Sequence, residues 1–554
     1  MIIVVIIIAN ILIDESPWML DLTADKRYSL TSGTIELLQK QEEPILAEVL
    51  FEGDFPAGYQ RLQSGVKDIL RRMQSYYPNL RIVVADPLKG EEEEVNNRMQ
   101  NFNKVGLVPM QLTYPGNVEF RAVNAFPYVV FNQGQKRVIV SLLEGTQIGS
   151  YSDELIFKAL SQLEYKFANS IQKINQSERK KIAFIEGLSP YGRPDLIGLE
   201  KELSKFYHLG RFNLDTVDFI HPQIDILIIP TVAKTLPDKY LLAIDQYVMN
   251  GGNILWMLDN YDINLDSIRS INGYVPVDFV SNIDNLLFKY GVRINQDLVV
   301  DKSCSTIPIV VSNAGGRPQY EFFDWYYHPV PAMNGSHPIT STLADLNLYF
   351  PSSIDTLGSN GKVTKTVLLF SSDYSKAQTM PRPISFELLR EPPIESYFDQ
   401  QELPLAVLLE GNFLSFFENR LTSDLSDLHR KYELQFKAIG EASIQVIVSD
   451  ADFILTNFAP DQQMTELPVG YNYFENKNYP GNLEFVLNVV EYMTGNKSLL
   501  PAKKNKIIIT KLDEIKAQRE SGKWQLVNIA LPLLLLSLFG ILYHWWRKSK
   551  YAKI

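Results

Sequence analysis

The feature that most constrains this chain is a long uncharged stretch near its C-terminus. Between Trp524 and Trp546 the sequence has no Asp, Glu, Lys or Arg. As a helix the stretch reaches roughly 34 Å, enough for the hydrocarbon core of a bilayer. Rings that prefer the headgroup level stand at its two ends: Trp524, Tyr543, Trp545 and Trp546. The pattern predicts a transmembrane helix, and the alternative is a buried core helix.

Basic residues after this stretch predict its orientation. Four cations follow with no acid among them: Arg547, Lys548, Lys550 and Lys553. Cations also precede the stretch, but acids are interleaved with them and they belong to a large domain, which can translocate despite its charge. We therefore expect the tail, residues 547–554, in the cytoplasm and most of the chain outside it.

The apolar run at the N-terminus, Met1 to Ile13, is harder to interpret. It reaches only about 20 Å as a helix, and it has neither the basic head nor the cleavage site of a secretory signal. It could be a buried element, an interfacial helix or an anchor that lacks its front end. Because the C-terminal span needs an N-terminal signal, we expect residues 1–20 to be a truncated anchor whose true start lies upstream of Met1.

Length, charge and cysteine content limit the classes of protein to which this chain can belong. At 554 residues the chain is too long for one core and predicts several domains. A net charge of −11 argues against nucleic acid as a partner. The single cysteine, Cys304, excludes a disulfide framework and a cysteine-rich zinc site, and it is expected to be a structural thiol.

The first part of the chain alternates between strand and helix patterns. "EEPILAEVLFEG" and "LRIVVADP" read as strands on either side of an amphipathic helix, and "FPYVVFNQGQKRVIVSLL" reads as a hairpin. The order of elements predicts a small thioredoxin-like α/β domain without a redox cysteine. The acidic run Glu91 to Glu94 is expected to be a solvated loop. A long amphipathic helix, "SDELIFKALSQLEYKFANSIQKI", follows.

Continuous apolar strands dominate the next part. "KIAFIEG", "IDILIIPT" and "NILWMLDN" alternate with helices, which indicates a parallel sheet covered on both faces. The order resembles the flavodoxin-like fold of class I glutamine amidotransferases, although the cysteine nucleophile and the histidine–glutamate pair of those enzymes have no counterpart at matching places. From Gly291 onward, strands alternate with proline-rich loops that complete or duplicate the sheet.

These patterns predict an α/β protein with membrane helices at both ends. The expected divisions are an anchor at 1–20, a thioredoxin-like domain at 21–150, a helix and linker at 151–180, a flavodoxin-like domain at 181–290, a second α/β part at 291–500, a juxtamembrane linker at 501–523, a transmembrane helix at 524–546 and the tail at 547–554.

Few residues suggest chemistry. Asp259 and Asp262 lie beyond the carboxyl end of a strand, where α/β proteins bind ligands, although surface turn carboxylates are common. Ser189 follows a strand, but its spacing is not that of a nucleophile elbow, so a turn serine is favoured. We predict these three as a ligand or partner loop. His328 and His337, each followed by proline, are expected in loops.

No catalytic, cofactor or metal residue is predicted. The sequence has no P-loop and no HExxH motif.

Several landmarks occur together and in order: "DLTADKRYSLT", "PLAVLLEGNFLSFFENR", "VIVSDADF", "NLEFVLNVVEYMTG" and the terminal span with its basic tail. In these the chain resembles the gliding-motility-associated ABC transporter auxiliary proteins of the GldG type found in Bacteroidota. The resemblance implies an inner-membrane protein with a large periplasmic part. It also implies a separate ABC permease and a separate ATPase as partners in gliding and its linked secretion machinery, and it carries over no catalytic residue.

Two function classes follow. The first is a non-catalytic binding or coupling subunit of the transporter. The second is an extracytoplasmic hydrolase of amidotransferase-like fold that uses Ser189 or Asp259. Convergence of several polar groups in one cleft would favour the hydrolase.

Overall fold

The structure is a computed structural model. It describes residues 29–105, 107–115, 120–143, 153–175, 179–270, 273–314, 317–341, 343–358, 362–390, 393–423, 435–459, 464–495, 499, 502 and 521–551. The expected anchor at 1–20 and most of the "DLTADKRYSLT" motif lie outside these residues. The chain divides into two units, Met1–Lys506 and Ile507–Ile554.

The first unit opens with a four-stranded mixed sheet in the order β2-β1-β5-β6. Its strands are β1 (Ile45–Val49), β2 (Leu80–Val84), β5 (Tyr128–Gln133) and β6 (Lys136–Ser141). β1 and β2 are parallel and are joined through helix α3 (Ala57–Tyr76), whereas β5 and β6 form an antiparallel hairpin beside β1. The expected strand–helix–strand unit and hairpin are therefore present in one sheet.

One face of this sheet is covered by α3 together with α2 (Ser32–Gln39) and α5 (Asp153–Asn175). The apolar side chains of α3 recur every three or four residues, so they lie along one face of the helix. All of them are buried: Leu62, Val66, Ile69, Leu70 and Met73. Burial of this stripe against the strands holds the helix in place.

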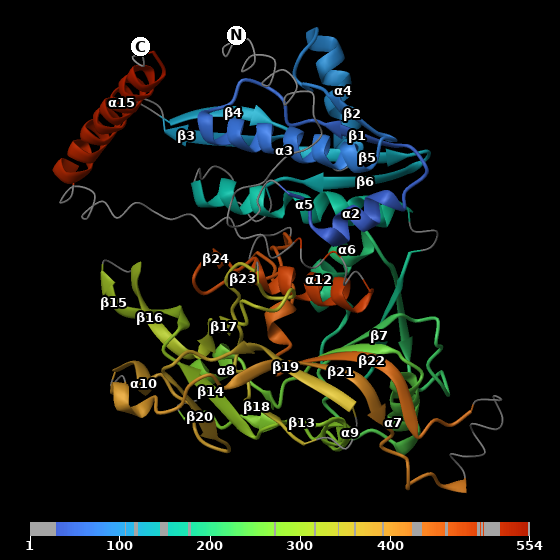
Figure 1. Ribbon diagram of the computed structural model, residues 1–554. Helices are drawn as coiled ribbons and strands as arrows, with labels where there is room; N and C mark the ends of the chain where they lie inside the picture. Colours follow the sequence, from blue (N-terminus) through green and yellow to red (C-terminus); the bar gives the residue numbers. More distant parts are fainter. Residues whose placement is uncertain are drawn as a thin grey trace. The chain divides into compact units, whose positions relative to one another are not determined.

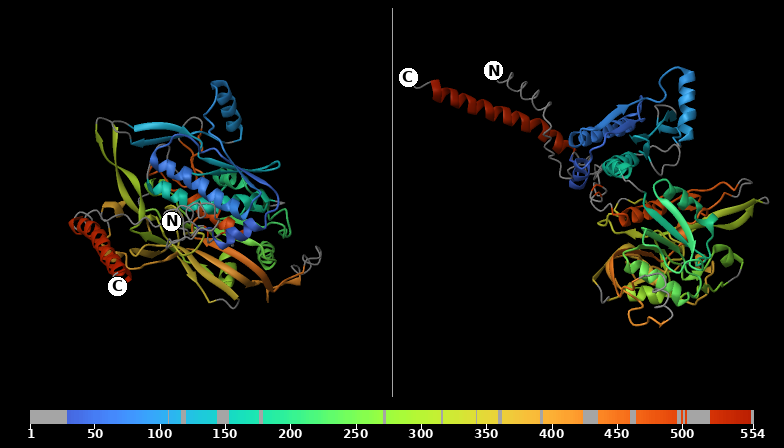
Figure 2. Two further views of the ribbon diagram at one scale, coloured as in Figure 1. Left: turned by 45° about the horizontal axis from the view of Figure 1, so that its top comes forward. Right: turned by 90° about the vertical axis from the view of Figure 1, so that its right-hand side faces the viewer.

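The acidic run Glu91 to Glu94 is solvated as expected, but the prediction of a loop is wrong. Three of the four glutamates form the first turn of helix α4 (Glu92–Lys104), which has no fully buried residue. Carboxylates at the N-terminus of a helix interact favourably with its dipole, so the same charges that suggested a loop stabilise the helix start. Figures 1 and 2 show α4 projecting from the N-terminal sheet. A two-stranded sheet, β3 (Met110–Pro115) with β4 (Phe120–Ala125), follows it.

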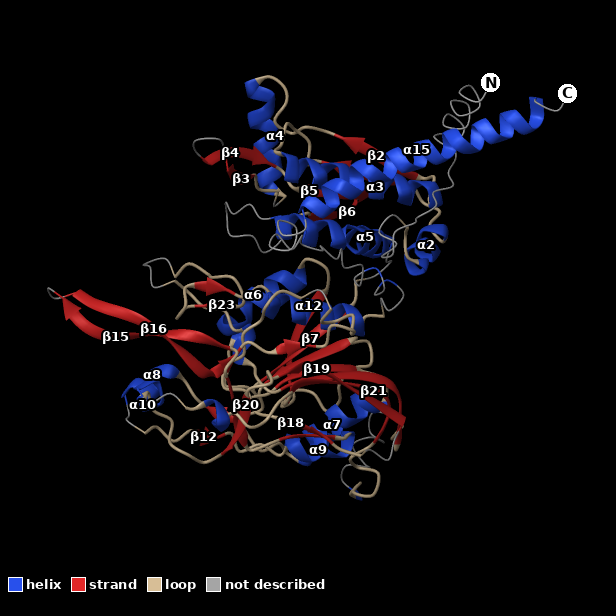
Figure 3. Cartoon of the chain, turned by 60° about the vertical axis from the view of Figure 1, so that its left-hand side comes forward, coloured by secondary structure: helices blue, strands red, loops and turns tan. Residues whose placement is uncertain are grey.

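The larger sheet of the first unit has eight strands in the order β17-β19-β21-β22-β10-β9-β7-β8. Five neighbouring strands are parallel: β8 (His208–Asn213), β7 (Lys181–Glu186), β9 (Ile226–Pro230), β10 (Asn253–Met257) and β22 (Ile439–Val448). Three antiparallel strands extend it: β21 (Pro404–Leu414), β19 (Lys362–Phe370) and β17 (Ala332–Met333). Strands from before and after Gly291 thus share one sheet (Figures 1 and 3).

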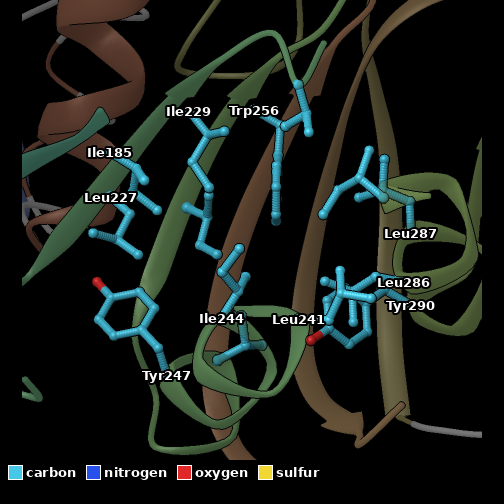
Figure 4. Packing of buried hydrophobic residues seen from close by; sticks show 14 of the residues in the cluster. Ile185, Leu227, Ile229, Leu241, Ile244, Tyr247, Trp256, Leu286, Leu287 and Tyr290 are labelled. Carbon is cyan, nitrogen blue, oxygen red and sulfur yellow. The ribbon is translucent and has the colours of Figure 1, made fainter. Parts of the chain in front are cut away.

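Helices cover both faces of the parallel strands. Helices α7 (Asp238–Met249) and α9 (Ile283–Tyr290) pack on one face, and α6 (Arg193–Ser204) and α12 (Gly481–Met493) pack on the other. Figure 4 shows Leu227 and Trp256 of the strands facing Ile244 of α7 and Leu287 of α9. Every residue of β9 is buried, which is why its sequence is a continuous apolar run without alternation.

Shorter elements surround the large sheet. Paired strands are β11 (Tyr261–Asp262) with β12 (Val277–Asp278), β13 (Val292–Ile294) with β18 (Ile354–Thr356), β14 (Asp297–Asp301) with β20 (Ser375–Thr379), β15 (Cys304–Ala314) with β16 (Arg317–Pro329), and β23 (Tyr471–Asn472) with β24 (Lys477–Asn478). Short helical segments are α8 (Leu265–Ser270), α10 (Glu387–Arg390), η1 (Glu395–Tyr397) and η2 (Asp452–Ile454). A separate apolar cluster around Trp325 holds part of this region together.

A polar cluster joins α5 to α12. The Glu491 carboxylate accepts hydrogen bonds from the Tyr165 hydroxyl and the Asn169 amide, and it forms a 3.1 Å ion pair with Lys173. The Lys173 ammonium also lies 4.0 Å from the centre of the Phe206 ring. The side chains of the ion pair are only 14% and 13% exposed, so water screens it weakly.

The second unit carries helix α15 (Ser521–Tyr551). Within the part of the chain that the structure describes, it is the one helix long and apolar enough to cross a membrane, over Val527–Lys550. Its apolar side chains are exposed, for example Leu534 at 66% and Phe539 at 68%. This helix fits membrane association by its length and composition.

The start of α12 gives a stability prediction. A Cβ at Gly481 would lie 2.6 Å from the backbone oxygen of Asp345, so Gly481→Ala has to push the helix away from that segment. We expect a loss of about 1–3 kcal/mol in the free energy of unfolding. Denaturant unfolding followed by circular dichroism measures it, with Gly335→Ala, where a Cβ meets nothing within 4 Å, as the control. Equal midpoints for the two variants would contradict this packing.

Candidate functional site

Four parallel strands of the large sheet end at the same edge, and polar residues follow each of them. Tyr191 comes after β7, Thr231 after β9, Asp259 after β10, and Asp450 and Asp452 after β22. We call these five residues the carboxyl-edge cluster. The strand order reverses between β7 and β9, and open α/β sheets bind ligands in the crevice beyond the carboxyl ends at such a point.

The Tyr191 hydroxyl lies at the centre of the cluster. Its oxygen is 2.8 Å from Asp259 Oδ2 and 2.6 Å from Asp452 Oδ1. A hydroxyl has one hydrogen to donate, so one of the two carboxyl groups must be protonated and donate to the tyrosine oxygen. Asp259 also accepts from Thr231 Oγ1 at 2.6 Å and from the Ala451 N–H at 2.8 Å, which favours its anionic form. Asp452 therefore carries the proton.

The charges of the cluster agree with this assignment. Burial, followed by the neighbouring Asp259 charge, raises the pKa of Asp452 to about 8. Burial raises the pKa of Asp259, and burial together with the Asp259 and Asp452 charges raises the pKa of Asp450 well above its usual value; hydrogen bonds partly offset the shift in both. The pKa of the Tyr191 hydroxyl is raised by burial and by the two carboxyl groups. Because no cation of the described residues contributes to the three carboxyl shifts, the cluster holds a proton at neutral pH.

The backbone around the cluster is tied together by the same groups. Asp450 is fully buried, and its two oxygens accept the N–H groups of Asp452 at 2.7 Å and Tyr349 at 2.6 Å. Thr231 has a φ of 42°, in the left-handed region that a β-branched residue rarely adopts. Its N–H donates to the Met257 carbonyl at 2.6 Å and its hydroxyl to Asp259, so two hydrogen bonds hold the strained residue.

Comparison with known proteins identifies the family to which the chain belongs. The family model described as "ABC-type uncharacterized transport system" matches residues 179–489, more than half of the chain. The chain belongs to this family of ABC transporter auxiliary proteins. The matched range contains the large sheet and the whole carboxyl-edge cluster. Membership supports a non-catalytic accessory role and implies association with transporter components.

The other comparisons add little to this family assignment. A model of a domain of unknown function matches residues 24–132. No curated protein matches the chain. A solved structure titled "mmIFT52 N-terminal domain" is 13% identical and aligns over 57% of this chain and 98% of its own, with a TM-score of 0.31, a value too low to support an argument.

Of the three residues predicted from the sequence as a ligand or partner loop, only Asp259 belongs to the cluster. Asp262 lies in β11 with an exposed side chain; its charge helps to raise the pKa of Asp259, but it makes none of the cluster's hydrogen bonds. Ser189 Oγ accepts the Tyr191 N–H at 3.1 Å, as a turn serine does. It thereby supports the turn from which the tyrosine reaches the cluster.

Sequence reasoning missed Tyr191, Thr231, Asp450 and Asp452 as site residues. A signal for the two aspartates was present, because "VIVSDAD" and "WMLDN" both place acids directly after an apolar strand. What joins them is the pairing of β22 with β10, between strands almost two hundred residues apart. Neither segment alone predicts that the two strands pair.

The expectation that His328 lies in a loop is wrong. It lies in β16 and is 1% exposed, with its ring centre 4.8 Å from that of Tyr349 and 4.9 Å from that of Phe350. The following proline was the misleading signal, because Pro329 is the last residue of the strand and so interrupts no further pairing. Burial lowers the pKa of His328 to about 3, so the ring is neutral. His337 lies outside named helices and strands, as expected.

Cys304 and the residues predicted at the membrane interface are not members of the cluster. Cys304 is the first residue of β15, and burial raises the pKa of its thiol, which disfavours the reactive thiolate. Trp524, Tyr543, Trp545, Trp546, Arg547 and Lys548 all lie in α15. The described ranges contain no group of three or more histidine, cysteine, aspartate or glutamate side chains arranged to hold a metal ion.

A cavity of about 330 Å³ lies away from the carboxyl-edge cluster, between α9 and the turn after β21. Lys289 and Glu418 in its wall form a 3.2 Å ion pair, and the Arg420 guanidinium lies 4.5 Å from the centre of the Phe416 ring. Buried Asp245 holds the turn by accepting from Ser415 Oγ and the Phe416 N–H. These contacts satisfy most of the polar lining within the protein.

The proton on Asp452 predicts a pH dependence of stability. Between an unfolded pKa near 4 and a folded pKa of about 8, the folded state binds a proton that the unfolded state has lost, so stability falls as pH rises through this window. Asp452→Asn keeps a donor for Tyr191 and removes the titration. We expect the free energy of unfolding of Asp452→Asn, relative to that of the wild type, to increase as pH rises. The increase should stay below the limit of about 1.4 kcal/mol per pH unit, because Asp452 is partly exposed.

Denaturant unfolding at pH 5, 7 and 9 measures this difference. The matched control is Asp262→Asn, which neutralises an exposed neighbour outside the hydrogen bonds of the cluster. Parallel pH profiles for the wild type and Asp452→Asn would show that Asp452 does not hold the proton.

Proposed function

We propose that the chain is a membrane-anchored, non-catalytic subunit of an ABC transporter complex with a coupling or binding role in gliding motility and its linked secretion. The observation that carries the proposal is the family match over residues 179–489. The finer part, gliding motility, rests on the sequence landmarks that resemble the GldG type. Its partners would be a separate permease and a separate ATPase.

The topology supports the proposed fold assignment. Across the sheet the parallel strands are β8, β7, β9, β10 and β22. If these strands are numbered one to five along the chain, their order in the sheet is 2-1-3-4-5, as in flavodoxin-like sheets. The mixed sheet β2-β1-β5-β6, with its parallel pair and its hairpin, suits a thioredoxin-like domain. We propose these folds within the divisions at 21–150 and 181–290, with the strands of 291–500 completing the second.

We propose α15 as the membrane anchor, with the bulk of the chain in the periplasm and the tail in the cytoplasm of an inner-membrane protein. The exposed apolar span Val527–Lys550 supports the anchor. Arg547 and Lys548 at its end support the orientation, because cytoplasmic flanks of membrane helices are enriched in cations. Tyr543, Trp545 and Trp546 would lie at the headgroup level.

We propose the loops that carry Ser189, Asp259 and Asp262 as a ligand or partner surface. The support is their place at the carboxyl edge where the strand order reverses. The hydrogen bonds of Tyr191 and Thr231 fix these loops to one another, and a fixed surface loses less entropy on binding than a mobile one. Asp262, exposed beside the cluster, offers a carboxylate to a cationic or hydrogen-bond-donating group.

The convergence of polar groups at this edge is the observation that favours the second candidate, an extracytoplasmic hydrolase of amidotransferase-like fold. The chemistry of the cluster favours the binding role instead. Ser189 Oγ accepts a backbone N–H, and the hydrogen bonds of the cluster involve carboxyl and hydroxyl groups but no histidine. A serine nucleophile needs an adjacent base within hydrogen-bond reach.

Purification from membranes in mild detergent tests the subunit role. We expect the full chain to bring a permease and an ATPase with it, identified by mass spectrometry. Ser189→Ala and Cys304→Ala should keep the motility of the cells, because neither side chain has a catalytic part in the proposal. Loss of motility in a Ser189→Ala chain that still assembles would support the hydrolase.

Thiol labelling tests the orientation of α15. In a Cys304→Ala background, Ser549→Cys should resist an impermeant thiol reagent in intact cells, because the cytoplasmic membrane shields it. Ser204→Cys, an exposed position in α6, is the matched control and should react once the reagent has crossed the outer membrane. The reverse pattern of labelling would invert the proposed topology.

A further inference from the structure

The hairpin of β15 and β16 has an apolar face that points away from the protein. Pro308 pairs with Phe322 and Val310 pairs with Tyr320, so these four side chains lie on one face of the ribbon. We call it the outer face of the hairpin. Val310 is 49% exposed, Tyr320 59% and Phe322 56%. Figure 3 shows the hairpin extending away from the strands of the large sheet.

The opposite face, which we call the inner face of the hairpin, is apolar near the base and polar farther out. Near the base, Ile307 and Trp325 are fully buried in an apolar cluster. Farther out, Glu321 and Gln319 are exposed, and Ser312 bonds to Gln319 at 2.5 Å. Farther out, the exposed Val310, Tyr320 and Phe322 therefore lie on the outer face, opposite Glu321 and Gln319. Nearer the base, the outer face also carries Thr306 and its exposed pairing partner Asp324.

Contacts at the base hold the hairpin on both of its faces, and Thr306 belongs to the outer one. The Thr306 N–H and hydroxyl both donate to Glu475, at 2.6 and 2.9 Å. On the other side, the Trp325 ring packs against those of Tyr327 and Phe386, with ring centres 5.3 and 5.2 Å apart. The hairpin cannot turn its apolar face inward without breaking one of these sets of contacts.

The size of the outer face indicates what covers it. Two half-exposed aromatic rings with Val310 and the bulge residue Val311 expose on the order of 400 Å², about half of the ~800 Å² per partner that a stable protein interface needs. Patches of this size on a monomer are often functional. Four apolar side chains suffice for contact with a surface to which the chain is already attached, because attachment makes the second contact intramolecular.

A lipid surface is within reach of the hairpin. Ala502 is buried in the apolar cluster of the N-terminal sheet and α15 begins at Ser521, so about 18 residues (503–520) join the packed part of the first unit to that helix, with a maximum reach of roughly 60 Å. Tyrosine and phenylalanine rings are favoured at the headgroup boundary, where one side is apolar and the other is wet. We propose that the outer face of the hairpin lies on the lipid surface of the membrane that α15 spans. This inference rests on the proposed membrane anchoring.

Two labelling sites on opposite faces of the hairpin test it. In a Cys304→Ala background of the full chain, Val310→Cys probes the outer face and Glu321→Cys is the matched control on the inner face. Each is labelled with an environment-sensitive nitrobenzoxadiazole dye and reconstituted into phosphatidylcholine vesicles, with or without a lipid that carries a nitroxide quencher. We expect a blue shift at 310 on reconstitution and quenching there about twofold or more above that at 321.

The outcomes separate this inference from the anchoring on which it depends. Protein that fails to float with the vesicles overturns the anchoring. Protein that floats but shows equal emission and quenching at 310 and 321 overturns the hairpin contact alone. A blue shift at 310 that requires a co-purified transporter component, without quenching by lipid, assigns the face to a protein partner and also overturns it. Phe322→Ser should weaken the shift at 310 and leave flotation unchanged.

Discussion

Burial of the parallel strands on both faces is the constraint on which the rest of this structure depends. With α7 and α9 on one side and α6 and α12 on the other, the middle of the large sheet has no place for a polar side chain without a buried partner. Within the sheet, Gln445 of β22 has such a partner, because its Oε1 accepts from Trp256 Nε1 at 2.9 Å, whereas the carboxyl groups of the cluster lie where the strands stop. The carboxyl-edge cluster is a result of that arrangement, since each member follows a strand whose middle or final residues are buried.

The cluster shows how carboxyl groups are accommodated next to an apolar core. Three aspartates with no cation of the described residues among the causes of their pKa shifts would repel one another at neutral pH if all were ionised. One retained proton and one tyrosine hydroxyl turn that repulsion into a chain of hydrogen bonds from Asp452 through Tyr191 to Asp259. The same series of hydrogen bonds joins the segments after β7, β10 and β22 to one another. The charges and the shape of this edge of the sheet therefore depend on each other.

Local patterns in the sequence predicted the local structure well. The periodic stripe of α3, the hairpin of β5 and β6 and the continuous apolar strands β7, β9 and β10 were all visible, because each pattern reports burial within one segment. The patterns failed where the cause lies outside the segment. His328 became a buried strand residue because the rings of Tyr349 and Phe350, from another segment, pack against it. The loop prediction at Glu91 to Glu94 failed for a different, local reason, because carboxylates suit the first turn of a helix as well as a loop. Asp259 was found from its place after a strand, but its partners Asp450 and Asp452 depend on a strand pairing across the chain.

The contact between α5 and α12 has a mechanical consequence. Glu491 lies two residues before the end of α12, and after that helix the chain runs on toward α15. Leu499 and Ala502, between the two helices in sequence, are buried in the apolar cluster of the N-terminal sheet, so a pull on the chain from the side of α15 acts first on these residues and then on the last turn of α12. Because Lys173, Asn169 and Tyr165 hold that turn, the load divides at once between the large sheet and the helix that covers the N-terminal sheet. The two sheets then bear the force in parallel, and neither has to unfold for the other to feel it.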